Sequence, residues 1–255
     1  MNAPTRQRRP DLMLISSVSV IALLLFWEAA CRLQWVDPLF LPPPSSVYAR
    51  MAGMWEQGSL MSHILASARR VMVGFAAATA LAIPLGIFLG TSRRARAAFD
   101  PILSCGSLPS MSWIPLSLLW FGITETQKYS IVFMGTFAPA LLYVIEATRN
   151  IDPLLIRAAR NLGASGPQVM RLVILPASLP QIFSGFKVIL GLSWTCVISA
   201  ELVAAKEGLG FLIMNGKEFF QTDTVVLGMA LISVTVLITD VVFRVIENRV
   251  LAWSR

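Results

Sequence analysis

Residues 152 to 180 read DPLLIRAARNLGASGPQVMRLVILPASLP, a short stretch with polar and basic side chains set between two strongly apolar segments. Asp152 followed by Pro153 is a typical helix start, because the Asp carboxylate accepts from the first free N–H groups and Pro suits the first turn. Gly163 favours a helix stop directly after Leu162. A helix of this length measures about 15 Å, roughly half of the hydrocarbon core of a bilayer, so it cannot span a membrane.

A second helix is predicted to begin almost at once. Ser165 and, three residues later, Gln168 have the pattern of a capping box. The helix that they start continues into the apolar residues beyond position 171. The stretch is therefore predicted to be a helical elbow at a membrane surface.

The composition of the whole chain indicates that its solvent is lipid. Of 255 residues, 56% are apolar and only 14% are charged, and the mean hydropathy is +0.69, values that do not fit a soluble domain. The three cysteines, Cys31, Cys105 and Cys196, all lie in apolar runs and are odd in number. They are interpreted as small hydrophobic residues and not as a disulfide framework.

The apolar runs predict an all-α polytopic membrane protein with six transmembrane helices. The predicted spans are residues 12–31, 63–91, 101–124, 129–148, 171–204 and 224–248. The predicted outer segments are residues 32–62, with an amphipathic helix near positions 47–55, and residues 205–223. The predicted cytoplasmic segments are residues 1–11, 92–100, 149–170 and 249–255.

The placement of basic residues supports this topology and accounts for the net charge of +7. Most of them fall in or beside the predicted cytoplasmic segments: Arg6, Arg8, Arg9, Arg93, Arg94, Arg96, Arg149, Arg157, Arg160, Arg171, Arg244, Arg249 and Arg255. Fewer lie outside: Arg32, Arg50, Arg69, Arg70, Lys128, Lys206 and Lys217. Both termini are therefore expected in the cytoplasm. No platform of basic and aromatic residues indicates nucleic acid as a partner.

Two regions are candidates for a translocation pathway. Pro109 and Pro115 each remove a hydrogen bond from the predicted third span, and the freed carbonyls need protein or a water-filled cavity around them. Met111 and Trp113 lie between these prolines and are included with them. In the fifth span the candidates are Trp194 and Thr195, at its middle, and Glu201, near its outer end.

The interpretation of Glu201 is open at this point. An ionisable residue at membrane depth is costly and is by default a functional hypothesis. No cation lies within one turn of Glu201 on its own helix. The side chain could hold the following loop through backbone N–H groups, or it could line an outer gate.

Catalytic chemistry is not expected of this chain. Residues 210 to 217 have one residue too many for a P-loop, and Glu218 stands where a Ser or Thr would bind Mg²⁺. The single histidine, His63, belongs to no cluster of metal ligands or catalytic residues. The sequence predicts no metal, no cofactor bound by this chain and no ATP hydrolysis.

The elbow resembles the EAA loop of permease subunits in ATP-driven (ABC-type) importers. In that loop Glu-Ala-Ala is followed after three residues by Gly, and after nine more by Ile-x-Leu-Pro. The matching positions are Arg157, Ala158, Ala159, Gly163, Val173, Leu175 and Pro176, with Arg157 in place of the Glu and Val173 in place of the Ile. The stretches LFLPPP (39–44), PLSLLWFGI (115–123) and AELVAAKEGLGFLI (200–213) are similar to the taurine, alkanesulfonate and nitrate permease group.

This resemblance implies the type I, MetI-like permease fold in the bacterial inner membrane, and a set of partners. These are a second permease copy in a homodimer, two cytoplasmic ATPase subunits that bind ATP and Mg²⁺, and a periplasmic substrate-binding protein. The solute implied is a sulfonate such as taurine, or a similar oxyanion. The residues implied in coupling to the ATPase are Arg157, Ala158, Ala159, Arg160, Gly163, Ala164, Leu175 and Pro176.

Other interpretations are weighed against this one. The elbow could be an ordinary cytoplasmic loop helix, although the Gly and Leu-Pro spacings would then both match by chance. The chain could be an ion-coupled secondary transporter or channel, but no repeat relates its two halves and its carboxylates lie near helix ends. A membrane enzyme or an assembly anchor would call for a catalytic cluster or a soluble domain.

Overall fold

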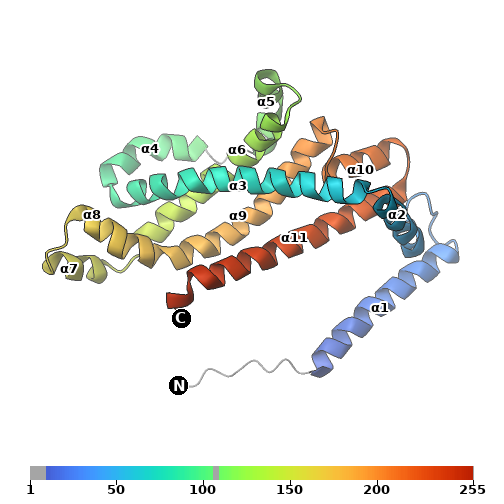
Figure 1. Cartoon of the computed structure of the whole chain (residues 1–255), viewed down its shortest axis with the longest axis horizontal. Helices are drawn as coiled ribbons and strands as arrows, with labels where there is room; N and C mark the ends of the chain where they lie inside the picture. Colours follow the sequence, from blue (N-terminus) through green and yellow to red (C-terminus); the bar gives the residue numbers. More distant parts are fainter. Residues whose placement is uncertain (1–9, 106–108, 255) are drawn as a thin grey trace. The chain divides into compact units, whose positions relative to one another are not determined.

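A computed structural model describes residues 10–105 and 109–254, and every regular element in them is helical (Figure 1). The predicted all-α class is therefore confirmed. Four helices in the described part of the chain are long and apolar enough to cross a membrane: Ser59–Thr91, Glu125–Arg149, Gly166–Val203 and Thr222–Val250. They correspond to the second, fourth, fifth and sixth predicted spans. The first predicted span falls on α1 (Pro10–Arg32), and the side chains of residues 10–17 lie outside the described ones. The count of six spans stays a prediction.

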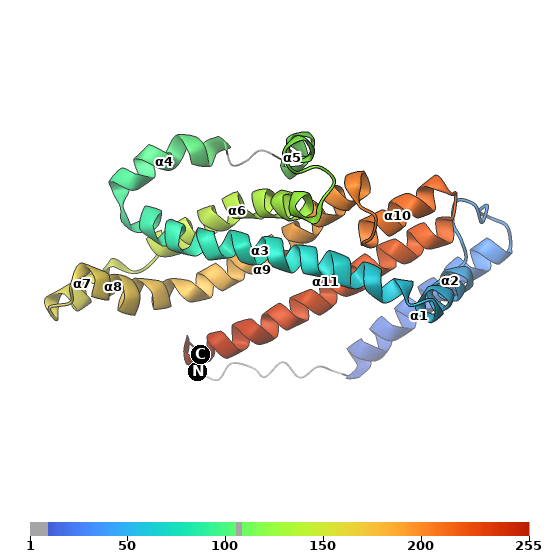
Figure 2. The ribbon, with the colours of Figure 1, turned by 45° about the horizontal axis from the view of Figure 1, so that its top comes forward.

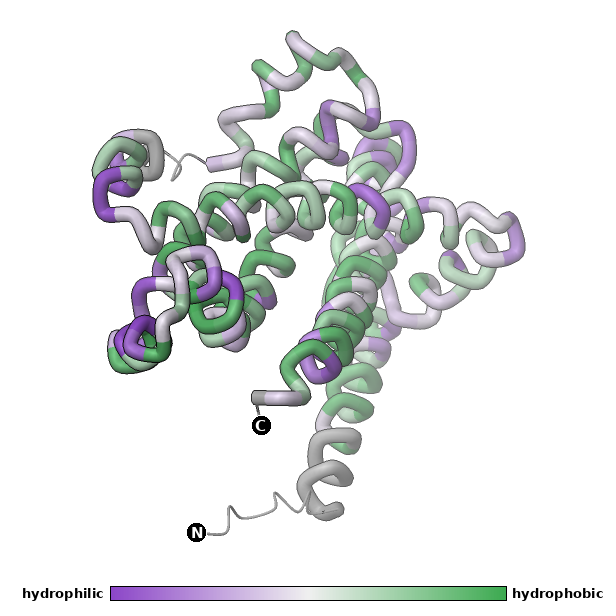
Figure 3. The backbone as a smooth tube through the Cα atoms, turned by 60° about the vertical axis from the view of Figure 1, so that its left-hand side comes forward, coloured by the Kyte–Doolittle hydropathy of each residue, from purple (hydrophilic) through white to green (hydrophobic). Residues whose placement is uncertain are grey.

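The helices group into two compact units, residues 62–211 with 231–255, and residues 1–61 with 212–230. In the larger unit, α3 (Ser59–Thr91), α6 (Glu125–Arg149) and α9 (Leu175–Ala204) lie lengthwise along one another (Figures 1 and 2). The long helices are hydrophobic over most of their length, and hydrophilic residues gather at helix ends and connections (Figure 3). This distribution is the one that a lipid environment selects.

Glycines on α3 allow it to approach α6 closely. A Cβ added at Gly86 would lie 2.6 Å from Cβ of Val144, a distance that real side chains do not reach. The same relation joins Gly74 to Val132 and Gly90 to Thr148. Because the separation in sequence is the same for all three pairs, α3 and α6 run parallel and in register.

The helices α6 and α9 run antiparallel and form the centre of the larger unit. Gly135 on α6 lies against Cys196 on α9, and Gly185 on α9 lies against Tyr143 on α6, so the order of contacts is reversed along the two helices. The core around them is made of fully or almost fully buried aliphatic side chains, among them Ile131, Val132, Val144, Ile145, Ile182 and Ile189. This core fixes the rotation of α9 about its own axis.

The region predicted as a third span, residues 101–124, is not a single helix. The helix α4 (Arg93–Cys105) begins within the predicted cytoplasmic loop 92–100. A 3₁₀ turn (Ser110–Trp113) then leads directly into α5 (Ile114–Phe121). Pro109 is the N-cap of the turn and Pro115 lies in the first turn of α5. The region is interrupted, as predicted, but each proline stands at the start of a helical element, where a missing N–H costs nothing, and not within a regular ladder.

In the smaller unit, the outer segment 32–62 contains α2 (Pro44–Glu56), where an amphipathic helix was predicted. Its first turn is attached to α1, because the backbone N–H and hydroxyl of Ser45 both donate to the carboxylate of Glu28, at 3.1 and 2.9 Å. The second predicted outer segment, residues 205–223, also holds a helix, α10 (Leu209–Glu218), which the sequence interpretation missed. After it, α11 (Thr222–Val250) begins.

Candidate functional site

The elbow predicted around residue 160 is present, and it begins as its sequence indicates. The helix α7 (Pro153–Asn161) has Asp152 as its N-cap, and the Asp152 carboxylate accepts from the N–H of Leu154 at 2.8 Å. Pro153 occupies the first turn, where its missing N–H is no loss. Both start signals are confirmed.

The end of α7 is a Schellman motif centred on Gly163. The N–H of Ala164 donates to the carbonyl of Ala159 at 3.1 Å, and the N–H of Gly163 donates to the carbonyl of Arg160 at 3.0 Å. This pattern requires a left-handed residue at Gly163, where φ is +82°. The predicted stop at Gly163 is confirmed together with its cause.

The helix α7 has no buried residue. Arg157, Ala158 and Arg160 are exposed, and so are Leu154 (67%) and Leu162 (88%). Ala159 and Ala164 are different, because they are half-buried and pack against the core of the chain itself. The face available to another protein is therefore a basic and aliphatic one, and the leucines on it were not singled out from the sequence.

A continuous helical path joins the elbow to α9. The helix α8 (Gly166–Val169) starts at Ser165, whose N–H donates to Oε1 of Gln168 at 2.8 Å. A π-helical segment (Met170–Ile174) follows, in which the N–H of Leu175 reaches back to the carbonyl of Met170. The next residue, Pro176, offers no N–H and lies in the first turn of α9. The chain is thus helical without a break from α8 into α9.

The predicted pathway residues divide into buried and exposed ones. Trp194 is 2% exposed and packs in the core, whereas its neighbour Thr195 is exposed. Met111 is exposed, and Trp113 packs edge-on against Trp120 with ring centroids 5.3 Å apart. The exposed members of the candidate set are Pro109, Met111, Pro115 and Thr195.

Glu201 lies in a buried cluster of charged and polar groups at the end of α9. Its side chain is 0% exposed and pairs with that of Arg70, also 0% exposed, at 2.7 Å from Nη1 to Oε1. The hydroxyl of Ser67 donates to Glu201 at 2.7 Å, and the N–H of Gly210 donates to its Oε2 at 2.8 Å. The bond from Gly210 is the loop-holding contact considered for Glu201 from the sequence.

Arg70 uses its remaining donors on two other parts of the same unit. Nη2 and Nε reach the carboxylate of Glu125, at the start of α6, at 2.6 and 2.8 Å. Nη1 also donates to the carbonyl of Glu207 at 2.7 Å. One guanidinium thus holds together α3, α6, α9 and the loop before α10. A sequence offers no signal for this pairing, because Arg70 and Glu201 are 131 residues apart.

The loop before α10 is held by two further bonds to α3. The N–H of Leu209 donates to the hydroxyl of Ser67 at 2.8 Å, and the N–H of Gly208 donates to Nδ1 of His63 at 3.1 Å. His63 therefore has a structural partner. No group of three His, Cys, Asp or Glu residues suited to a metal ion occurs in the described part of the chain.

Comparison with known proteins identifies the family to which this fold belongs. Residues 82–252 match the family described as "binding-protein-dependent transport system inner membrane component". The chain is 36% identical over 244 residues to the taurine transport system permease protein TauC of Escherichia coli (strain K12), which covers 93% of this chain and 89% of that protein. It is 34% identical over 235 residues to the putative aliphatic sulfonates transport permease protein SsuC of the same organism, covering 92% and 89%.

A solved structure has the same fold. It is the MetNI methionine ABC transporter in an inward-facing conformation, whose matching chain superposes with a TM-score of 0.66 at 21% identity, covering 79% of this chain and 97% of that one. The predicted MetI-like fold is confirmed. The chain therefore belongs to the family of binding-protein-dependent transport system inner membrane components, as a non-catalytic, multi-pass permease subunit of an ABC-type importer in which partner subunits hydrolyse ATP.

Proposed function

We propose that this chain forms the translocation path for taurine or a related alkanesulfonate, as one of two identical permease copies. The observation that carries the proposal is the identity of 36% to the taurine permease over nearly the full chain, together with 34% to the aliphatic sulfonate permease. Two ATPase subunits that bind ATP and Mg²⁺ and a periplasmic binding protein complete the proposed importer. Family membership sets aside an ion-coupled transporter or channel.

The elbow is the proposed contact with the ATPase. Its support is the exposed basic and aliphatic face of α7 and the helical continuity from α8 into α9. Arg157 and Arg160 are available for carboxylates of the ATPase, and Gly163 sets the angle between α7 and α8. When ATP draws the two ATPase subunits together, α7 moves with them and changes the relative stability of two permease states. Leu175 and Pro176, the first residues of α9, receive this movement through α8 and the π-helical segment.

The proposed pathway uses the exposed members of the candidate set, Met111 beside Pro109 and Pro115, and Thr195 on α9. The cluster of Arg70 and Glu201 supports an outer closure, because it joins α3 to the start of α6 and to the end of α9. Trp113, which packs against Trp120, and Trp194, which is buried in the core, are proposed to support the residues that line the pathway.

Uptake into proteoliposomes tests the proposed substrate. The permease, its cognate ATPase and its binding protein are reconstituted, and accumulation of labelled taurine, an alkanesulfonate, nitrate and methionine is measured with and without internal ATP. We expect ATP-dependent uptake of taurine or the alkanesulfonate, and none of methionine. Uptake of nitrate alone would contradict the sulfonate assignment while leaving an oxyanion importer.

Cysteine labelling tests the proposed orientation, with both termini in the cytoplasm. A single cysteine at Ser92, after α3, is expected to react only with reagents supplied from the cytoplasm. One at Gly58, before α3, is expected to react only from outside, because α3 is long enough to cross the bilayer. The reverse labelling at either position would overturn the orientation.

A further inference from the structure

The junction between α10 and α11 turns at an aromatic residue in a conformation that disfavours it. The helix α10 ends in a Schellman motif, in which the N–H of Gln221 donates to the carbonyl of Gly216 at 2.8 Å and that of Phe220 to the carbonyl of Lys217 at 3.3 Å. The left-handed position of such a motif usually holds Gly. Here it holds Phe220, with φ of +54°. The backbone is therefore strained at a bulky side chain.

Burial within the chain does not compensate this strain. The side chain of Phe220 is 79% exposed. A large aromatic residue that is both strained and exposed gains nothing from the fold of its own chain. Backbone strain of this kind clusters at functional sites, so Phe220 is a candidate contact for a partner.

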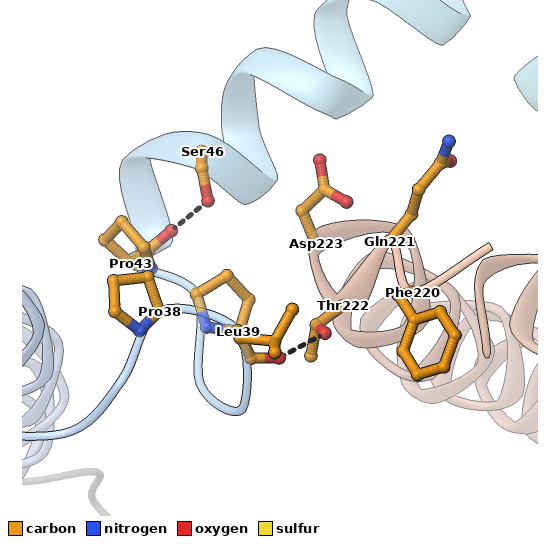
Figure 4. A pocket seen from close by; sticks show the side chains of 9 residues that line it. Pro38, Leu39, Pro43, Ser46, Phe220, Gln221, Thr222 and Asp223 are labelled. Atoms are coloured by element: carbon orange, nitrogen blue, oxygen red, sulfur yellow. Dashed lines mark hydrogen bonds between the residues drawn. The ribbon is translucent and has the colours of Figure 1, made fainter.

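Phe220 forms part of a pocket of about 390 Å³ in the smaller unit (Figure 4). One wall is made by the α10–α11 junction, including Phe220, Thr222 and Asp223, and the other by the loop before α2, including Pro38, Leu39 and Pro43. The Thr222 hydroxyl donates to the carbonyl of Leu39 and ties the walls together. The pocket is therefore formed before anything enters it.

A second contact holds the same two parts. From α2, Arg50 donates through Nε to the Thr224 hydroxyl at 2.9 Å and through Nη2 to Oε1 of Gln221. Arg50 is thus occupied with uncharged partners. Asp223 accepts the N–H of Thr224 at 2.7 Å, and no cation lies within 4 Å of its carboxylate in the described part of the chain. The lining presents prolines, an aromatic ring and a carboxylate without an ionic partner.

This chemistry suits an apolar side chain next to a Lys or Arg on another protein. The proline-rich wall offers apolar surface without N–H donors, and the carboxylate complements a cation. Both walls belong to the segments 32–62 and 205–223, which the charge pattern places outside the cytoplasmic membrane. The family to which the chain belongs is described as binding-protein-dependent, and the proposed function places that binding protein on the outer side.

We propose that this pocket receives an apolar side chain and a neighbouring cation of the soluble binding protein, and that Phe220 is a central contact of that interface. The inference rests on the proposed function, because it assumes that a binding protein delivers the solute. The membrane interface also accepts exposed aromatic residues. A concave pocket with a carboxylate fits a protein protrusion better than a layer of lipid headgroups.

The test is Phe220→Gly, which removes the ring and at the same time relieves the left-handed strain. The assembled complex should be at least as thermostable as the wild type and should show the same basal ATPase rate without binding protein. The binding-protein concentration that gives half-maximal ATPase stimulation should rise about tenfold or more, as for an aromatic hot spot. Asp223→Asn should raise it less, and the difference from the wild type should shrink at high salt.

The matched control is Phe219→Ala. Phe219 is the preceding aromatic residue, is 65% exposed and does not line the pocket, so its loss should leave the stimulation curve nearly unchanged. An unchanged curve for Phe220→Gly would overturn the inference. A defect that is seen in lipid nanodiscs but not in detergent would assign Phe220 to the membrane and also overturn it. If the wild-type complex itself is not stimulated by its binding protein, the proposed function fails instead.

Discussion

Arg70→Met is expected to lower the free energy of unfolding of the permease by about 3–5 kcal/mol, the usual cost of removing one partner from a buried ion pair. Glu201 is fully buried, and without Arg70 its charge would keep only the hydrogen bonds from Ser67 and Gly210. Glu125 contributes less, because its side chain is 38% exposed and water screens it. The measurement is the thermal unfolding midpoint and the yield of the purified complex.

The neighbouring residue provides the control for Arg70. Arg69 lies 3.5 Å from Glu125, but its side chain is 56% exposed. Arg69→Met should therefore change stability by less than about 1 kcal/mol. The double variant Arg70→Met with Glu201→Gln should recover much of the loss, since it no longer buries an unpaired charge. Wild-type stability of Arg70→Met alone would show that the cluster does not hold the helices together.

Gly163→Val is expected to abolish most transport while leaving the permease folded in the membrane. The backbone at Gly163 has φ of +82°, and a β-branched residue in this conformation costs roughly 1–2 kcal/mol. A Cβ at this position would meet no atom within 4 Å, so the effect comes from the backbone and not from a clash. The strain is too small to unfold the packed helices, but it changes the angle at which α7 meets the ATPase. Solute uptake and ATPase activity are measured on the same reconstituted complex.

Two further substitutions test whether transport depends on the backbone conformation at Gly163 or is lost with any change in this region. Gly166 also has open space around it, but without a left-handed φ, so Gly166→Ala should transport like the wild type. Gly163→Asn should retain much of the activity, because Asn tolerates the left-handed conformation. Purification of the Gly163→Val complex shows whether the ATPase is lost or remains bound without coupling. If the Gly163→Val complex keeps its ATPase and transports at the wild-type rate, the elbow is not the coupling element.

The sequence by itself determined the class of the protein and the geometry of the elbow. Composition alone indicates lipid as the solvent. The start of α7 at Asp152 and its stop at Gly163 depend on hydrogen bonds between residues at most five positions apart. Such bonds follow from local residue types, so a pattern of caps and turns reveals them without any tertiary information.

Local sequence patterns predict helix starts and breaks less well where contacts with neighbouring elements determine them. Pro109 and Pro115 are predicted to interrupt one span, and the structure adds that they lie at the starts of short helical elements. A proline that breaks a helix and one that starts a helix look the same in sequence, because both merely lack an N–H. The helix α10 lies within the predicted outer segment 205–223, for which the sequence analysis predicts no helix.

Only the tertiary structure decided which distant residues meet. Glu201 has no cation on its own helix, and its partner Arg70 comes from α3. The two walls around Phe220 come from segments more than 170 residues apart. The contacts of Arg70 depend on the rotation and register of whole helices, which are fixed by the joint packing of the core and by the close approach of Gly74, Gly86 and Gly90 to α6. A pattern along one helix contains no information about the rotation of the next, and the charged cluster is a consequence of that rotation.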